Sequence, residues 1–243
     1  MPPRPGDQRT DPRDQRRLHH APLVRYSDRF GSAGSGTQRH SRLAPYSALF
    51  SEETLRLYGL EHGAQSIRTY ESLLIPGLLQ TEDYARALMT SEITTIRQVE
   101  VDQRVDVRLR RQQRLVGEDP LHLIAIVSQA ALLQQTGGQR VLRDQLAHLA
   151  RVIEKRPEVV QVRVIPFTAT GCGAFGASTF HLVDFASPRL PTLSWQETVT
   201  AGGIIDDESH VRDFNLTYTE ALGRTLNEQN SLDLINQCAK EIT

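Results

Sequence analysis

The sequence predicts a mixed α+β domain, in which a small β-sheet packs against several amphipathic helices. Three observations lead to this class. Some segments repeat apolar residues every three or four positions, as one face of a helix does, and others repeat them every second position, as a half-buried strand does. The hydrophobic and charged shares of the 243 residues, 39% and 23%, are those of an ordinary globular protein that can bury a core.

An N-terminal arm, residues 1–48, is expected to be disordered, and a single folded domain is expected over residues 49–243. The arm shows no apolar periodicity and is dominated by Pro, Gly, Ser, Gln and Arg, so it cannot bury enough apolar surface to offset the entropy lost on ordering. The arm is basic and the remainder acidic, which allows at most a weak, non-specific contact with nucleic-acid phosphates. The same composition is also typical of a plain disordered arm.

The first helix of the domain is expected after Ser51, a suitable N-cap. Residues 66–70 alternate as a strand does. Pro76 and Gly77 then predict a turn, because proline lacks a backbone donor and glycine permits a positive φ. Thr81 is expected to cap the next helix.

The rest of the domain continues the same alternation of helix and strand. The clearest helix follows Gly137-Gly138, where Leu142, Leu146 and Leu149 recur at helical spacing. The strands expected after the Thr81 helix, the last three in one sheet, cover 121–127, 159–165, 178–185 and 192–199. The other helices expected cover 96–116, 211–226 and, after a cap at Ser231, 234–238.

The segment Gly171–Gly176 satisfies the glycine pattern of a dinucleotide-binding loop, but a strand-like segment follows it, so no helix N-terminus would face a phosphate. A flexible loop between two strands is the better prediction. Cys172 in this loop is a candidate nucleophile only if a base such as His181 or His148 lies beside it.

No metal site and no cofactor are expected. The histidines lack the short spacing of zinc ligands, and the two cysteines, Cys172 and Cys238, are expected to be reduced. Asp206, Asp207 and Glu208 are better explained as the cap and first turn of a helix than as a cation site. No signal peptide or membrane-length apolar run occurs, so a cytoplasmic protein is expected.

Arg104, Arg108 and Arg111 would share one side of the helix expected over 96–116, which we call the arginine face. This face could bind an anionic ligand, pair with Glu71 or Glu197 across the fold, or be solvated. The sequence leaves the three interpretations open.

Five motifs in order along the chain carry a resemblance to a known family. They are residues 70–86 (YESLLIPGLLQTEDYAR), 108–112, 137–138 with 145–149, 161–166, and Glu197 after a strand. Through them residues 67–235 resemble the C-terminal domain of actinobacterial WhiJ-like regulators, where it follows an Xre-type helix-turn-helix. The chain departs from the family in two ways, because no helix-turn-helix is expected before the domain and Ser128-Gln129 replaces a usual acidic pair.

The resemblance implies a ligand-responsive or protein-binding effector domain. The first hypothesis is therefore a stand-alone effector domain of transcriptional regulation, without its own DNA-reading module, that binds a small molecule or a small regulatory partner protein. The alternative is a domain recruited as an enzyme of specialised metabolism, with Glu197, Glu71 or His181 supplying acid or base. No catalytic residue is assigned beyond these candidates.

The residues expected to bind the ligand surround a pocket near the Pro76-Gly77 turn. They are Tyr70, Glu71, Gln80, Arg108, Arg111, Gln112, Trp195 and Glu197.

Overall fold

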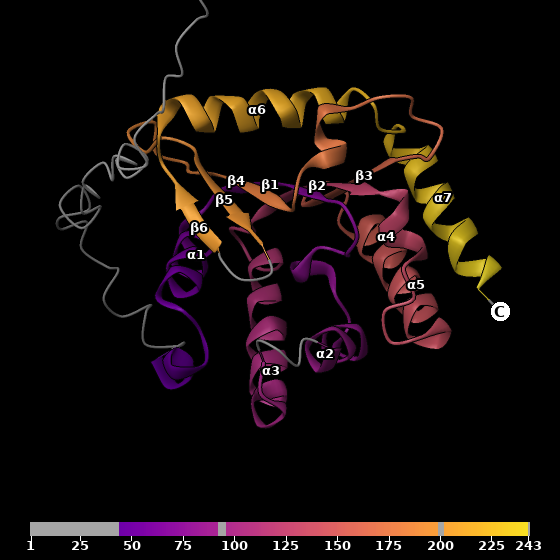
Figure 1. Ribbon diagram of the computed structural model, residues 1–243, viewed down its shortest axis with the longest axis horizontal. Coiled ribbons are helices and arrows are strands. Elements are labelled where there is room, and N and C mark those ends of the chain that lie inside the picture. Colours follow the sequence, from indigo (N-terminus) through magenta and orange to yellow (C-terminus); the bar gives the residue numbers. More distant parts are fainter. Residues whose placement is uncertain (1–43, 92–95, 199–201, 243) are drawn as a thin grey trace, which may run out of the picture. The chain divides into compact units, whose positions relative to one another are not determined.

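A computed structural model describes residues 44–91, 96–198 and 202–242, in which helices cover both faces of a six-stranded sheet (Figure 1). The strands lie in the order β3-β2-β1-β4-β5-β6. Three are parallel: β1 (Ser66–Glu71), β2 (His122–Ser128) and β3 (Val160–Ile165). The other three continue from β1 in antiparallel fashion: β4 (Phe180–Asp184), β5 (Leu193–Glu197) and β6 (Gly202–Ile205). The predicted mixed α+β class is confirmed.

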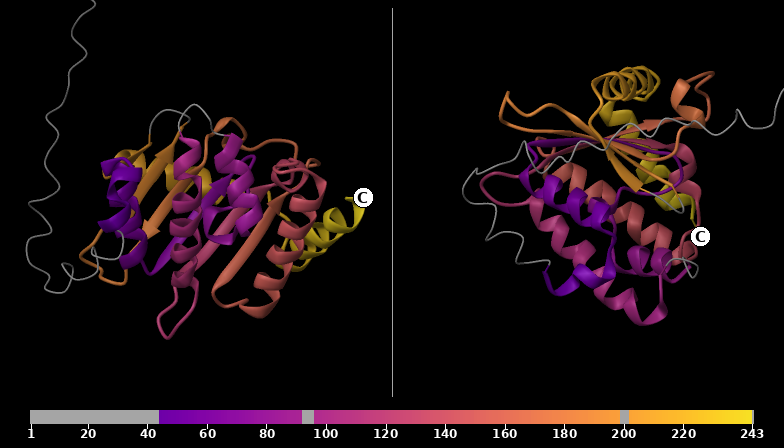
Figure 2. Two further views of the ribbon diagram at one scale, coloured as in Figure 1. Left: turned by 90° about the horizontal axis from the view of Figure 1, so that it is seen from below. Right: turned by 60° about the vertical axis from the view of Figure 1, so that its left-hand side comes forward.

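One face of the sheet, here called the helical face, is covered by most of the helices, which lie beside one another in Figure 2. They are α1 (Glu52–Gly63), α2 (Glu82–Ser91), α3 (Val101–Arg111), α4 (Gln129–Leu133) and α5 (Gln139–Lys155). The opposite face, the α6 face, carries α6 (Glu208–Leu222). The last helix, α7 (Glu228–Glu241), packs against β3 and α5.

Alternation along β1 separates two cores. Ile67 points into the larger core on the helical face, together with Leu146 of α5. Tyr70 points into the core on the α6 face, where its ring stacks on Phe180 at a centroid distance of 5.7 Å. Consecutive residues of β1 therefore face different chemical environments.

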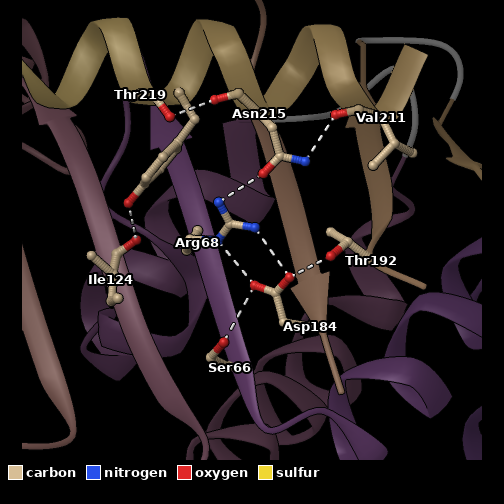
Figure 3. A network of polar contacts seen from close by, with 9 residues as sticks. Ser66, Arg68, Ile124, Asp184, Thr192, Val211, Asn215 and Thr219 are labelled. Carbon is tan, nitrogen blue, oxygen red and sulfur yellow. Dashed lines mark hydrogen bonds and ion pairs between the residues drawn. The ribbon is translucent and has the colours of Figure 1, made fainter. Parts of the chain in front are cut away.

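A polar network holds α6 on the sheet (Figure 3). The guanidinium of Arg68 donates to both carboxylate oxygens of Asp184, at 2.9 and 3.1 Å, and to the side-chain oxygen of Asn215 of α6 at 2.8 Å. The hydroxyl of Tyr218 donates to the backbone carbonyl of Ile124 at 3.0 Å. These groups are satisfied by one another, so the network is a structural link between α6 and the sheet.

The N-terminal cap of α1 is confirmed, because Ser51 accepts a hydrogen bond from the N–H of Thr54. Thr81 likewise accepts from the N–H of Tyr84 at the start of α2, and Asp207 caps α6. Gly137 and Gly138 have φ of 74° and 86°, the left-handed conformation that glycine tolerates best, immediately before α5.

Several predicted boundaries were wrong. The helix expected over 96–116 consists of α3 between the 3-10 helices η6 (Gln98–Glu100) and η7 (Gln112–Leu115). The helix expected to reach Leu226 ends at Leu222, and Asn227, not Ser231, caps α7. Ser231 instead accepts a hydrogen bond from the backbone N–H of Val164, because it lies buried against β3.

Other elements had no clear signal in the sequence. Neither α4 nor β6 was predicted, and the 3-10 helices η5 (Gly77–Leu79) and η8 (Gly173–Gly176) occupy expected turns or loops. The 3-10 helix η4 (Ala44–Leu49) begins inside the expected arm. Residues 1–43, on which the prediction of disorder and of no helix-turn-helix depends, lie outside the described residues.

Candidate functional site

A buried carboxylate lies where β1 ends on the helical face. Glu71 is only 5% exposed, and strand alternation places Thr69 on the same face. The antiparallel partner β4 pairs His181 with Thr69, and Thr179 precedes the same strand. Two strands that are distant in sequence thus bring four polar side chains together.

Hydrogen bonds link these four side chains. Thr179 donates to Oε2 of Glu71 at 2.9 Å, and Thr69 donates to Oε1 at 3.2 Å. Nδ1 of His181 lies 2.7 Å from the Thr69 hydroxyl oxygen. One placement of the hydrogen atoms gives every donor an acceptor: Nδ1–H of His181 donates to the Thr69 hydroxyl, and that hydroxyl donates to Glu71. In this tautomer Nε2 of His181 carries no hydrogen and is an acceptor.

The electrostatic setting makes Glu71 titrate near neutral pH. Burial raises the pKa of its carboxyl to about 7, against the lowering effects of Thr179, Thr69 and Arg108, and the Glu197 carboxylate adds to the rise. Burial also lowers the pKa of His181 to about 4, assisted by the positive charge of Arg111. At neutral pH the site therefore contains a neutral imidazole beside a carboxyl group that readily gains or loses a proton.

Arg111 of the arginine face is held by Glu61 of α1. Its guanidinium donates to both oxygens of that carboxylate, at 2.9 and 2.6 Å, and lies 4.1 Å from the ring centroid of Tyr58. Burial by itself lowers the pKa of Arg111, but Glu61, Tyr58 and Glu197 together outweigh burial and the net effect is a rise. The pair is almost completely buried, so Arg111 supplies a fixed positive charge beside His181.

The other two arginines have different partners. Arg104 forms an ion pair with Glu100 at 3.0 Å, and Arg108 donates to the side-chain oxygen of Gln80 at 2.6 Å. The interpretation of a solvated arginine face was wrong for Arg104 and Arg111, whose side chains are 16% and 14% exposed. Neither the Glu100 pair nor the Glu61 pair was predicted from the sequence.

Gln80 and Gln112 were predicted to bind a ligand, and both bond to the backbone of the loop 75–81. Gln80 donates to the carbonyl of Ile75 at 2.8 Å, and Gln112 donates to the carbonyl of Gln80 at 2.6 Å. Gln145 of α5, which is fully buried, accepts from one N–H of this loop and donates to one of its carbonyls. The amide side chains of Gln80, Gln112 and Gln145 thus hold the loop 75–81 in place. This loop contains Gln80, the hydrogen-bond partner of Arg108.

At Gly77, within the same loop, the backbone does not adopt a positive φ, contrary to the expectation for the turn. A Cβ at this position would lie 3.7 Å from the guanidinium carbon of Arg108. That distance is an ordinary van der Waals contact, so neither the backbone conformation nor the space beside Arg108 requires glycine here.

Strand β5 completes the site with Trp195 and Glu197. Trp195 is 2% exposed and packs against Leu57 and Val107, and within the described part of the chain its Nε1–H has no hydrogen-bond partner. A Cβ on Gly202 of the neighbouring strand would come within 2.5 Å of the indole ring, so glycine is needed there. Glu197 is exposed and lies within electrostatic range of Glu71 and Arg111.

Tyr70 is the predicted site residue that the structure separates from the others. It is buried on the α6 face because it precedes Glu71 in the same strand. Cys172 also packs on the α6 face, whereas His181 faces the helices, so the hypothesis of a Cys172 nucleophile activated by His181 was wrong.

Glu61, Thr69 and Thr179 were not predicted as site residues from the sequence. Thr69 was recognisable in principle, because it stands two positions before Glu71 in a strand. Nothing in the sequence next to Thr179 or Glu61 indicates that these residues belong to the site.

Metal-binding clusters and membrane-spanning helices are both absent from the described residues. These residues contain no group of three or more His, Cys, Asp or Glu side chains placed to hold a metal ion. None of their helices combines the length and the apolar character that crossing a membrane requires.

The fold and the site together define a class, an α+β domain with a buried, titratable polar cluster at the end of its central strand. The chain belongs to the family described as Domain of unknown function (DUF5753), which matches residues 54–237. Comparisons with curated proteins and with solved structures found no match.

Proposed function

We propose that this domain is a small-molecule-binding effector domain of the kind that follows the helix-turn-helix in WhiJ-like regulators of transcription. The observation that carries the proposal is Glu71, a carboxyl group that is 5% exposed, held by two threonine hydroxyls and poised to titrate near pH 7. A buried ionisable group is costly to maintain, and such groups concentrate at binding and catalytic sites. The cytoplasm is the compartment that goes with this role, and a small regulatory protein is the other partner we propose.

The groups around Glu71 favour a ligand that donates hydrogen bonds. The carboxylate of Glu71, the neutral ring of His181 and the exposed carboxylate of Glu197 all offer acceptors. Arg111 is already neutralised by Glu61, so it does not attract an anion strongly. A primary amine or an amide N–H is the complementary chemistry.

Calorimetry and native mass spectrometry of the full chain against a panel of small primary amines and amino-acid amides test this proposal. We expect saturable binding by the wild type and at least tenfold weaker binding by Glu71→Gln, which preserves shape and removes the charge. Glu154→Gln, a change at an exposed position of α5, is the matched control and should bind as the wild type does. Equal binding by the wild type and Glu71→Gln, or no binding by any of the panel, would overturn the proposal.

A second candidate function is acid-base catalysis at the same cluster. The pKa of about 7 for Glu71 is close to the value that serves proton transfer best at neutral pH, and Thr69 connects this carboxyl to the neutral His181. If the domain is an enzyme, Glu71→Gln should abolish turnover of a compound that it still binds. Unchanged turnover in this variant would exclude Glu71 as the acid or base.

A further inference from the structure

A hollow of about 420 Å³ lies on the α6 face, at the carboxyl ends of the three parallel strands. Tyr70, Ser128 and Ile165, from the ends of β1, β2 and β3, form its floor. Its volume falls within the range of small-molecule sites, and the carboxyl ends of parallel strands are where ligands commonly bind in α/β sheets. This hollow is distinct from the Glu71 site, which faces the helices on the other side of the sheet.

The segment between β3 and β4 forms a wall of the hollow and is anchored at two points. The N–H of Phe167 donates to the side-chain oxygen of Gln129 of α4 at 2.7 Å. The N–H of Gly173 donates to the carboxylate of Glu220 of α6 at 3.2 Å. These bonds tie the wall to helices on both faces of the sheet, so the hollow is formed before any ligand enters.

Exposed apolar side chains gather around this hollow. Leu73, Phe167 and Phe175 all line it, and they are 55%, 63% and 51% exposed. Large apolar side chains that are scattered singly need no explanation, but three around one hollow indicate a surface that an apolar ligand covers.

Tyr70 contributes a side chain with a hydroxyl group to the floor of the hollow. The residue is 2% exposed, and its hydroxyl forms no hydrogen bond to another described residue. Tyr218, on the same face, shows the usual arrangement, because its hydroxyl donates to the carbonyl of Ile124. The Tyr70 hydroxyl is not fully enclosed, because it does not belong to the fully buried, unpartnered polar atoms of the described residues, so a ligand oxygen in the hollow can take the place of water beside it.

We infer that this hollow binds a small aromatic molecule that carries one hydroxyl or carbonyl group. The ring of the ligand covers the apolar wall, and its oxygen bonds to the Tyr70 hydroxyl. This inference goes beyond the proposed function, because it concerns a second site with different ligand chemistry.

Binding of 2-naphthol and of naphthalene to the full chain, followed by the fluorescence of the probes and by NMR of ¹³C-labelled tyrosine, tests the inference. We expect saturable binding of both probes to the wild type, with a shift of the Tyr70 resonance. Tyr70→Phe removes only the hydroxyl, so it should weaken 2-naphthol binding roughly 2- to 12-fold and leave naphthalene binding unchanged. Ala169→Trp, which fills the hollow from its wall, should abolish binding of both.

Two control variants separate this site from the rest of the molecule. Leu216→Ala removes an exposed apolar side chain of α6, and Glu71→Gln alters the other site; neither should change 2-naphthol binding. The inference is overturned if the wild type binds neither probe, if Tyr70→Phe binds 2-naphthol as tightly as the wild type, or if a folded Ala169→Trp still binds. A concentration-dependent dimer that Phe175→Ala abolishes would also overturn it, since a second copy would then cover the hollow.

Discussion

Replacing Glu71 by glutamine should change how the stability of the domain depends on pH. The folded-state pKa of this carboxyl is raised to about 7 from an ordinary value of 4.5, chiefly by burial. A raised pKa means that the folded state binds the proton more tightly than the unfolded state. The stabilisation from Glu71 is therefore fully present below pH 4.5 and is lost as the pH rises through 7.

The size of the effect follows from the shift. A shift of about 2.5 pKa units corresponds to about 3 kcal/mol, since each unit is worth about 1.4 kcal/mol. Glu71→Gln removes this titration, so its free energy of unfolding relative to the wild type should improve by about 3 kcal/mol between pH 4.5 and pH 8. Glutamine can keep bonds to Thr69 and Thr179, because both hydroxyls can rotate to accept or donate.

The pH dependence of stability measured on the wild type by itself would not reveal the contribution of Glu71. His181 has a folded-state pKa lowered to about 4 from 6.5, so its stabilisation is present above pH 6.5 and is lost as the pH falls through 4. The contributions of Glu71 and His181 oppose each other and nearly cancel across the same range. The difference between variant and wild type is therefore the informative quantity.

Urea denaturation at half-unit steps between pH 4.5 and pH 8 measures that difference. Glu154→Gln, at an exposed position, provides the control and should differ from the wild type by less than about 0.5 kcal/mol at every pH. A constant difference between Glu71→Gln and the wild type would refute the reasoning, since it would mean that Glu71 titrates alike in the folded and unfolded states.

Two further changes test the structure around the site. Glu61→Gln leaves the charge of Arg111 buried without its carboxylate partner, so the free energy of unfolding should fall by about 3 to 5 kcal/mol. The double variant with Arg111→Met should recover part of this loss, because it also removes the buried charge. A fall below about 1 kcal/mol in Glu61→Gln would contradict the buried pair. Gln145→Ala removes two hydrogen bonds to the loop 75–81, so it should lower the free energy of unfolding by about 3 kcal/mol, measured by thermal or urea unfolding. The control Gln229→Ala, at an exposed position of α7, should lower it by less than about 0.5 kcal/mol. Equal losses in the two variants would mean that the amide of Gln145 does not hold the loop.

The predictable part of the fold was the part with strong local periodicity. The helix α5 repeats leucine at helical spacing, and β3 alternates valine with polar residues, so both were found close to their observed ends. The short elements α4 and β6 were missed because five and four residues contain too little of either period. Ser231 was misassigned as a cap because a serine before apolar residues has that pattern whether its hydroxyl meets its own helix or a neighbouring strand.

The candidate site was predicted less completely. Glu71, Arg111, Trp195 and Glu197 lie on the helical face, but the sequence could not show that Glu61 would neutralise Arg111 across a gap of 50 residues. Gln80 and Gln112 were recognised by their motifs, yet only the structure shows that their amides bond to backbone groups.

The sequence by itself determined the class of fold and most helices and strands, because these depend on periodicity and capping residues. The tertiary structure decided which side chains share an environment. Tyr70 and Glu71 are neighbours in the chain, yet one faces the hollow on the α6 face and the other a polar cluster on the helical face. The physical reason is that a strand sends consecutive side chains to opposite faces, and only the packing of helices on each face fixes what those side chains meet.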